Sequence, residues 1–203
     1  MTTIYSNDAG CLQINSGAGV EIFHYNDTPH DDPVRIGVSG SDTYVGMVWF
    51  QEVLIDNAAV VSSAILHLAF PSLGAVPSIR VYGNARDTAA FPTDPSVALV
   101  EILSHGTAAH VDQAIGSTMA IEIKNVIQEI VNRPGWVSGN PLMLFVSAAN
   151  GGAFAQMETA GAFGSFSEPY LVFGSSGGGS GGGPGGQVGR NAAFFLMLME
   201  DPR

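Results

Sequence analysis

The chain has 203 residues, 46% of them hydrophobic and 12% charged, so it can bury a sizeable core and is not intrinsically disordered. Its formal net charge is −11, with only seven Lys and Arg residues, and such a surface repels the phosphates of nucleic acids and of anionic membranes. The length is that of one domain with or without an extension.

The first residues of the chain do not have the pattern of a targeting signal. Residues 1–5 lack both a basic start and an apolar region, and no apolar run approaches the ~20 residues of a membrane helix. We therefore expect synthesis in a cytoplasm, without a signal peptide. Cys11 is the only cysteine, which excludes an internal disulfide framework. With no preorganised partner nearby, it is interpreted as a small apolar residue rather than a nucleophile.

Residues 1–40 are predicted to form short strands with frequent turns, including strands at residues 11–14 and 20–23. The polar stretch 24–33 holds two His and three Asp, which are ligand types for zinc or calcium. Their spacing matches no zinc motif or EF-hand, and Pro29 and Pro33 are typical of a solvated loop. We therefore predict no metal site there.

Residues 44–55 are rich in aromatic and β-branched side chains, which favours a half-buried strand. Alternation puts Val48 and Phe50 on one face, and Met47 and Trp49 on the other. If Phe50 is in the core, Trp49 points away from it. Packing under a loop or helix is the favoured interpretation for Trp49; a platform for a sugar or a partner protein is the alternative.

Residues 60–70 also alternate, which puts His67 on the solvent side of a strand. Residues 79–83 are predicted to form another strand. A loop with two prolines is expected at 84–96, followed by an extended run at 97–103.

The only convincing amphipathic helix lies near residues 123–133. Its apolar side chains recur at three- and four-residue steps, which puts them on one face: Ile123, Val126, Ile127, Ile130 and Val131. Asn125 is the predicted N-cap, with Gln128 in the capping-box position, and Pro134 and Gly135 end the helix. We expect this helix to cover an open end or face of a sandwich.

Residues 142–146 are wholly apolar, which indicates a buried strand. In the Gly- and Ala-rich stretch 148–167, Met157 and Phe163 are expected to fill the sandwich edge. Residues 168–173 close the domain with a strand. The predicted fold of residues 1–173 is therefore all-β: a jelly-roll-like antiparallel β-sandwich with one short amphipathic helix.

Residues 174–189 have the composition of a flexible Gly-rich linker. The C-terminal segment 190–203 contains an apolar run that is costly to leave in water. We predict that this run binds a partner by strand addition, in cis or in trans. Its larger side chains are Phe194, Phe195, Leu196, Met197, Leu198 and Met199.

The order and spacing of several runs resemble DNRLRE-type β-sandwich domains between residues 44 and 173. The corresponding stretches are residues 50–55, 60–68, 79–82, 121–124 with the helix after them, 139–144 and 168–171. The DNRLRE motif itself is absent, and Lys124 replaces the usual Thr cap. The resemblance implies a jelly-roll-like sandwich akin to carbohydrate-binding modules, as found in cell-surface and phage structural proteins. It implies no catalytic residues.

The favoured function is a non-enzymatic structural protein of a phage particle: a capsid decoration, head-fibre or tail component located in the virion. Its expected partners are copies of itself, as a homo-oligomer, or other virion proteins. The alternative is a carbohydrate-binding module that binds a surface glycan on Trp49, Trp136 or Tyr25. A hydrolase is disfavoured, because outside the Gly-rich linker the chain has no Gly-x-Ser-x-Gly elbow, and it has no His-Glu-x-x-His motif or phosphate loop. We expect no cofactor and no metal.

Overall fold

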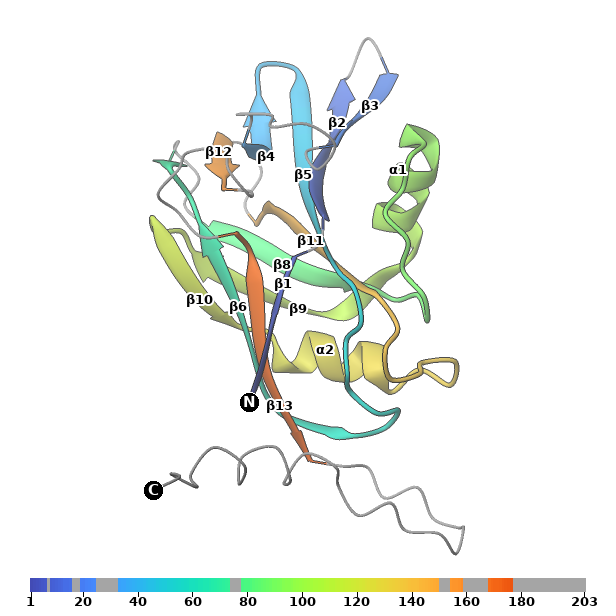
Figure 1. Ribbon diagram of the computed structural model, residues 1–203. Helices are drawn as coiled ribbons and strands as arrows, with labels where there is room; N and C mark the ends of the chain where they lie inside the picture. Colours follow the sequence, from blue (N-terminus) through green and yellow to red (C-terminus); the bar gives the residue numbers. More distant parts are fainter. Residues whose placement is uncertain are drawn as a thin grey trace, which may run out of the picture.

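The computed structural model of the chain describes residues 1–6, 8–15, 19–24, 33–73, 78–149, 154–158 and 168–176 (Figure 1). In these ranges the chain forms two antiparallel β-sheets and two helices. The prediction of an all-β antiparallel sandwich is confirmed. The helix count differs from the prediction, because a second helix forms in the described part of the chain.

Sheet A is the smaller sheet, with four strands. Alternation along its longest strand follows the prediction: Leu66 and Leu68 are buried, whereas His67 between them is only partly covered. The strand order is β1 (Thr2–Tyr5), β13 (Tyr170–Ser176), β6 (Val60–Ala69) and β10 (Thr118–Glu122).

Sheet B is larger, and β5 lies at its centre. β5 (Asp42–Phe50) pairs with β2 (Asp8–Asn15) on one side and with β4 and β11 on the other. β3 (Gly19–His24) pairs with β2. The main path runs β7 (Ser72–Leu73), β12 (Phe154–Met157), β4 (Val34–Ser39), β5, β11 (Leu142–Ala148), β8 (Ser78–Asn84), β9 (Gly106–Ala114).

Sheet B is buried on both faces around β5 and β11. Val48 and Phe50 join the main core between the sheets, whereas Met47 and Trp49 join a second, smaller core on the opposite face. The predicted division of this strand is therefore confirmed. The same geometry explains the apolar run of β11, whose first five residues are all buried. Met157 is also buried in the main core, as predicted; Phe163 lies outside the described residues.

Helix α2 (Lys124–Val131) is the predicted amphipathic helix, and it covers the open end of the sandwich (Figure 1). Four of its apolar side chains are buried: Val126, Ile127, Ile130 and Val131. The helix comes close to β8 because Gly83 has no side chain there. A Cβ at Gly83 would lie 2.5 Å from Ile130 Cδ1.

Polar side chains of α2 also join the two sheets. Gln128 accepts a hydrogen bond from Val61 N (2.8 Å) and donates one to Ala59 O (2.9 Å) beside sheet A. On the other side, the Glu129 carboxylate accepts from the N–H groups of Ala108 and Ala109 in β9, at 2.8 and 2.7 Å. The helix therefore connects sheet A to the β9 edge of sheet B.

The predicted cap of α2 is wrong. Asn125 lies inside the helix, and the N-cap is Ile123, which makes no side-chain cap hydrogen bond. Glu122 Oε1 accepts instead from Lys124 N, at 3.0 Å. Gln128 is not part of a capping box, because its side chain bonds to Val61 N, Ala59 O and Asn132 Oδ1. The end of the helix is as predicted, since Asn132 is the C-cap, just before Pro134.

Helix α1 (Pro95–Ser104) forms where the sequence predicts an extended run at 97–103, so that prediction is wrong. Asp94 is the N-cap: its Oδ1 accepts from Ser96 N at 2.8 Å and Val97 N at 3.4 Å. Pro95 occupies the first turn, where its missing N–H costs nothing. The Asp-Pro pair was the sequence signal for this helix start.

The last strand runs further than predicted. Gly174–Ser176 pair with residues of β6, with a bulge between Gly174 and Ser175. Residues 177–203, which include the rest of the predicted linker and the apolar C-terminal segment, lie outside the described residues. Among the helices of the described ranges, none is long and apolar enough to cross a membrane.

Candidate functional site

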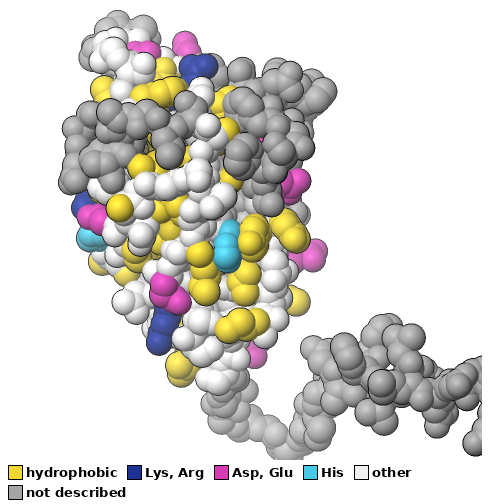
Figure 2. Space-filling view, turned by 90° about the vertical axis from the view of Figure 1, so that its left-hand side faces the viewer, with side chains coloured by type: hydrophobic (Ala, Val, Ile, Leu, Met, Phe, Trp, Pro, Cys, Tyr) yellow, Lys and Arg dark blue, Asp and Glu magenta, His cyan; other side chains and the backbone are white. Residues whose placement is uncertain are grey.

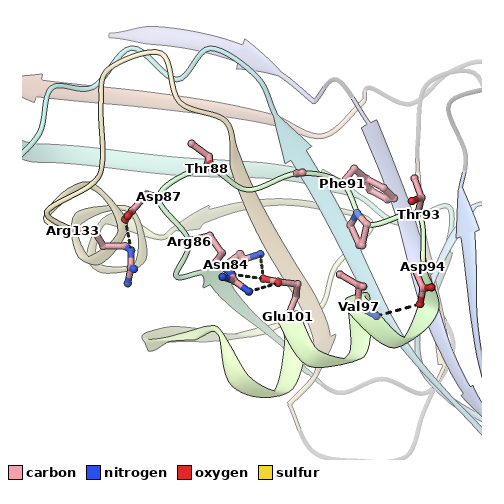
Figure 3. A pocket seen from close by; sticks show the side chains of 12 residues that line it. Asn84, Arg86, Asp87, Thr88, Phe91, Thr93, Asp94, Val97, Glu101 and Arg133 are labelled. Atoms are coloured by element: carbon pink, nitrogen blue, oxygen red, sulfur yellow. Dashed lines mark hydrogen bonds and ion pairs between the residues drawn. The ribbon is translucent and has the colours of Figure 1, made fainter.

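A polar cleft of about 520 Å³ lies beside α1 (Figure 3). Its walls are the loop of residues 85–94, the helix α1 and the side chain of Arg133. We call it the α1 cleft. Its volume lies within the range of about 300–1,000 Å³ that is usual for small-molecule sites.

A charge pair holds one wall of the cleft. The Arg86 guanidinium donates to both oxygens of Glu101, from Nη2 at 2.7 Å and from Nε at 3.1 Å. Asn84 Nδ2 also donates to Glu101 Oε2, at 3.0 Å. Burial acts to raise the pKa of Glu101, but the hydrogen bonds from Arg86 and Asn84 outweigh it, so the pKa lies below its usual value. Glu101 is therefore an ionised acceptor at neutral pH.

A second charge pair lies across the cleft. Arg133 Nε donates to Asp87 Oδ1 at 2.8 Å, with both side chains more than a third exposed. The neighbouring Gly135 makes room for this pair, because a Cβ there would overlap the Asp87 carboxylate. Figure 3 shows this pair beside the Arg86–Glu101 pair, with Phe91 and Asp94 farther along the cleft.

The loop 85–94 is held to the sandwich by backbone contacts. Trp49 Nε1 donates to Ala89 O at 2.6 Å, and Asn140 Nδ2 donates to Asp87 O at 2.7 Å. Ala85 N donates to His105 O at 2.6 Å. These hydrogen bonds hold the first half of the loop, residues 85–89, in place.

Asn84 is an unusual residue of the cleft lining. Its side chain is buried, with 2% exposure, and its Oδ1 accepts no hydrogen bond within the described part of the chain. Buried polar atoms nearly always have a partner, so an acceptor without one indicates a place where a bound molecule or water completes the lining.

The outer face of sheet A is a different kind of surface. Tyr5, Tyr170 and His67 lie side by side across three strands. The rings of Tyr5 and Tyr170 are 5.6 Å apart, and His67 stacks on Tyr170 at 4.2 Å with 5° between the planes. Tyr5 is 60% exposed. The three rings form a continuous aromatic row.

The next residues on this face are also uncharged. Thr3, Val172 and Ile65 form the adjoining row, ending at Glu122 on the β10 edge. Figure 2 looks at the molecule from this side and shows hydrophobic and other uncharged side chains around a His, with an acidic and a basic side chain lower on the face. Partial burial lowers the pKa of His67, which favours its neutral form at pH 7.

The predicted aromatic platforms have different surroundings. Trp49 is partly buried and bonded to the loop 85–94, which confirms the interpretation that it packs under a loop. Trp136 is 2% exposed, and its Nε1 donates to Ile55 O at 2.8 Å. The prediction of an exposed ring is therefore wrong for Trp136, because its indole fills the core. Tyr25 lies outside the described residues.

The other predicted site residues remain untested by the geometry. The six apolar residues Phe194–Met199 lie outside the described residues, as does most of the polar stretch 24–33. Among the residues that the structure describes, no group of three or more His, Cys, Asp or Glu could hold a metal ion. Cys11 is a buried thiol in the main core.

Sequence reasoning missed both surfaces described above. The aromatic row combines the first and last strands of the domain, and no spacing in the sequence pairs Tyr5 with Tyr170. The α1 cleft depends on a helix that was not predicted.

Comparison with known proteins gives no relative. No protein-family model matches the chain, and no curated protein sequence matches it. The resemblance to DNRLRE-type domains therefore stays a prediction.

Proposed function

We propose that this protein is a non-enzymatic structural protein that acts through protein–protein assembly, as a homo-oligomer that buries the outer face of sheet A. The observation that carries the proposal is the composition of that face. It presents the aromatic row and the adjoining Thr3, Val172 and Ile65, with Glu122 at its edge.

Charge explains why this face suits a second copy of the chain. Two molecules with a net charge of −11 repel each other, and like charges brought together in an interface cost several kcal/mol. An uncharged face lets two copies meet without burying carboxylates. Aromatic rings such as Tyr5 and Tyr170 are also the residues that contribute most to the centres of interfaces.

The outer face of sheet A is too small to form a stable interface by itself. Four strands about 4.8 Å apart, with about five residues each at about 3.3 Å per residue, cover roughly 300 Å² in projection. Even doubled for the relief of the side chains, this stays below the about 800 Å² per partner of a stable interface. Another segment must contribute the remaining contact area.

We propose the apolar C-terminal segment as that element. The described chain ends at Ser176, in the strand that lies between β1 and β6 of the same sheet. The composition of residues 177–191 predicts a reach of about 19–23 Å, which is enough to cross to a neighbouring copy. Six large apolar side chains, Phe194–Met199, would then leave water on assembly.

The setting that we propose is a phage particle, in which the protein would be a capsid decoration, head-fibre or tail component. The support for this setting is the resemblance to DNRLRE-type domains, which occur in phage structural proteins.

Analytical ultracentrifugation of the full chain tests the proposal. Wild type should sediment as an oligomer, and Ile65→Glu or Val172→Glu should shift it to monomer, because each introduces a carboxylate near the centre of the face. The matched control is Val137→Glu, at a residue 62% exposed after α2, which should leave the oligomer unchanged. A wild-type monomer at high concentration, or variants that assemble normally, would refute the proposal.

A truncation tests the C-terminal segment separately. The chain should be cut after Ser176, because Gly174–Ser176 are paired with β6. We expect the shortened protein to keep its melting temperature and to associate more weakly than wild type. Unchanged association would remove the segment from the interface. A large fall in melting temperature would show that the segment belongs to its own sandwich.

A further inference from the structure

We propose that the α1 cleft is a binding site for a neutral saccharide. The proposal is independent of the assembly proposed above, since α1 and sheet A lie on opposite sides of the molecule in Figure 1. The cleft would therefore stay open when the outer face of sheet A is covered.

The charge pattern of the cleft selects a neutral ligand. Arg86 is paired with Glu101 and Arg133 with Asp87, and Asp94 is held by the start of α1. An anionic ligand would have to compete with these carboxylates for the guanidinium groups, and a cation would have to displace the guanidinium groups. A neutral ligand with hydroxyl groups disturbs neither pair.

The paired groups still offer hydrogen bonds to hydroxyls. Arg133 uses only Nε on Asp87, and Arg86 uses Nε and Nη2 on Glu101, so each guanidinium keeps N–H groups without a partner in the described ranges. Carboxylates have further lone pairs that accept from hydroxyls. Thr88 and Thr93 add hydroxyl groups to the lining. A sugar hydroxyl both donates and accepts, so it can use all of these.

The apolar part of the lining suits the C–H face of a sugar ring. Phe91 and Val97 both line the cleft, toward Asp94 and away from Arg133, as Figure 3 shows. Saccharide rings have polar edges and less polar faces, and aromatic side chains with a few well-placed polar groups bind such molecules. This combination distinguishes the cleft from the uncharged outer face of sheet A.

Two further observations support a ligand. Residues 85–89 of the loop are held by hydrogen bonds with Trp49, Asn140 and His105, so binding costs little ordering of this part of the site. Asn84 Oδ1, in the lining, is a buried acceptor with no donor among the described residues. A polyhydroxyl ligand brings hydroxyl donors to this wall of the cleft.

The test uses the full chain and four neutral trisaccharides: maltotriose, cellotriose, xylotriose and chitotriose. Saturation-transfer NMR and Trp fluorescence report binding, since Trp49 touches the loop that forms the cleft wall. We expect at least one trisaccharide to bind saturably. Arg133→Ala should weaken its Kd by about tenfold or more, because lost hydrogen bonds to a charged group change affinity by that order.

The matched control is Arg80→Ala. Arg80 forms an ion pair with Asp112 at 2.8 Å and has a similar exposure to Arg133, but it lies away from the α1 cleft. Its Kd should equal that of wild type. Thr88→Val is a second cleft variant, which removes a hydroxyl at an exposed position without changing the fold and should also weaken binding.

Several outcomes would overturn the proposal. One is that no trisaccharide of the panel binds; another is that Arg80→Ala and Arg133→Ala weaken binding equally. Inorganic phosphate should also be titrated. If phosphate binds in a manner sensitive to Arg133→Ala while no trisaccharide does, the cleft is an anion site and the saccharide proposal is wrong.

Discussion

The two helices use their apolar side chains in opposite ways. α2 buries Val126, Ile127, Ile130 and Val131 at the end of the sandwich, where it meets both sheets. α1 buries only Ala98 and Ile102, and its exposed residues include three apolar ones: Val97 (49%), Val100 (51%) and Leu103 (73%). α1 rests on one face of sheet B, so one narrow strip of it is covered.

The comparison shows that burial follows from position in the fold rather than from hydrophobicity. α2 is a structural element of the core, whereas α1 is a surface helix that forms one wall of the α1 cleft. Substitutions in α2 should therefore change stability strongly, and substitutions on the outside of α1 should not.

The largest effect is expected for Ile127→Asp. Ile127 is fully buried, and an unpaired carboxylate there should cost more than about 4 kcal/mol, a large share of the ~5–15 kcal/mol stability of a typical domain. Urea unfolding followed by circular dichroism measures the loss. Asn125→Asp, on the exposed side of the same helix, is the control and should be nearly neutral. A folded Ile127→Asp variant of wild-type stability would show that α2 is not a core element.

Gly83→Ala should have the next largest effect. The added Cβ meets Ile130, Val126 and Thr107, so α2 must move or repack, at a cost of about 1–3 kcal/mol. Denaturant unfolding should be compared with Gly116→Ala, where the nearest atom to a new Cβ is 3.7 Å away. Equal stability of the two variants would mean that the approach of α2 to β8 is not tight.

Asp94→Ala should weaken α1 and leave α2 intact. It removes the side chain that accepts from Ser96 N and Val97 N, so the first turn of α1 loses its cap. We expect a melting temperature a few degrees lower and faster amide hydrogen exchange confined to α1. Asp94→Asn keeps a good cap and should behave like wild type. Faster hydrogen exchange in both helices would contradict the prediction that the stability of α1 is independent of that of α2.

Acid should weaken α1, as Asp94→Ala does, because it protonates the Asp94 cap. Hydrogen bonds from the Ser96 side chain and from the Ser96 and Val97 backbones lower the pKa of Asp94. A depressed pKa in the folded state means that the cap stabilises α1 above the ordinary Asp pKa of about 3.9, and that this contribution is lost as pH falls through the folded value.

The N-cap residue of α2, Ile123, makes no side-chain cap hydrogen bond, so loss of the Asp94 cap should weaken α1 alone. Hydrogen exchange between about pH 5 and pH 2.5 measures it, corrected for the intrinsic rate. Asp94→Asn should abolish the acid effect in α1. Acid weakening of α1 that persists in Asp94→Asn would assign the effect to another group.

The smallest effect is expected for Val100→Asp, on the outside of α1. Val100 is half exposed, so the free energy of unfolding should change by less than about 0.5 kcal/mol. The measurement is urea unfolding beside Ile127→Asp. A loss of several kcal/mol would mean that this side of α1 is covered in solution, and the contrast between the helices would fail.

Local patterns in the sequence determined much of the sandwich. The alternation in β5 and β6, the apolar run of β11 and the three- and four-residue steps of α2 each predict an element that the structure contains. These patterns predict structure because each element buries one face or both, and the spacing of the apolar residues follows from which face is buried.

Other features depended on contacts between distant residues. The start of α1 was readable from Asp94 and Pro95, but the apolar residues of this helix do not show an amphipathic pattern, because half of them face solvent. The predicted cap of α2 is wrong, because Gln128 bonds to Val61 N, Ala59 O and Asn132 Oδ1 and not to the backbone at the start of the helix. The sequence does not show that Trp136 is buried, because the carbonyl of Ile55, which accepts its N–H in the core, is far away in the chain.

The sequence by itself determined the β class, the amphipathic helix and the division of β5 into two faces, because these follow from the order of apolar and polar residues along the chain. The two candidate surfaces, the aromatic row and the α1 cleft, form only in the tertiary structure. The aromatic row needs the pairing of β1 with β13 and of β13 with β6, and the α1 cleft needs Arg133 to reach Asp87 across 46 residues of sequence. Local patterns do not predict such pairings, since another uncharged strand could have paired with β13 and another carboxylate could have paired with Arg133.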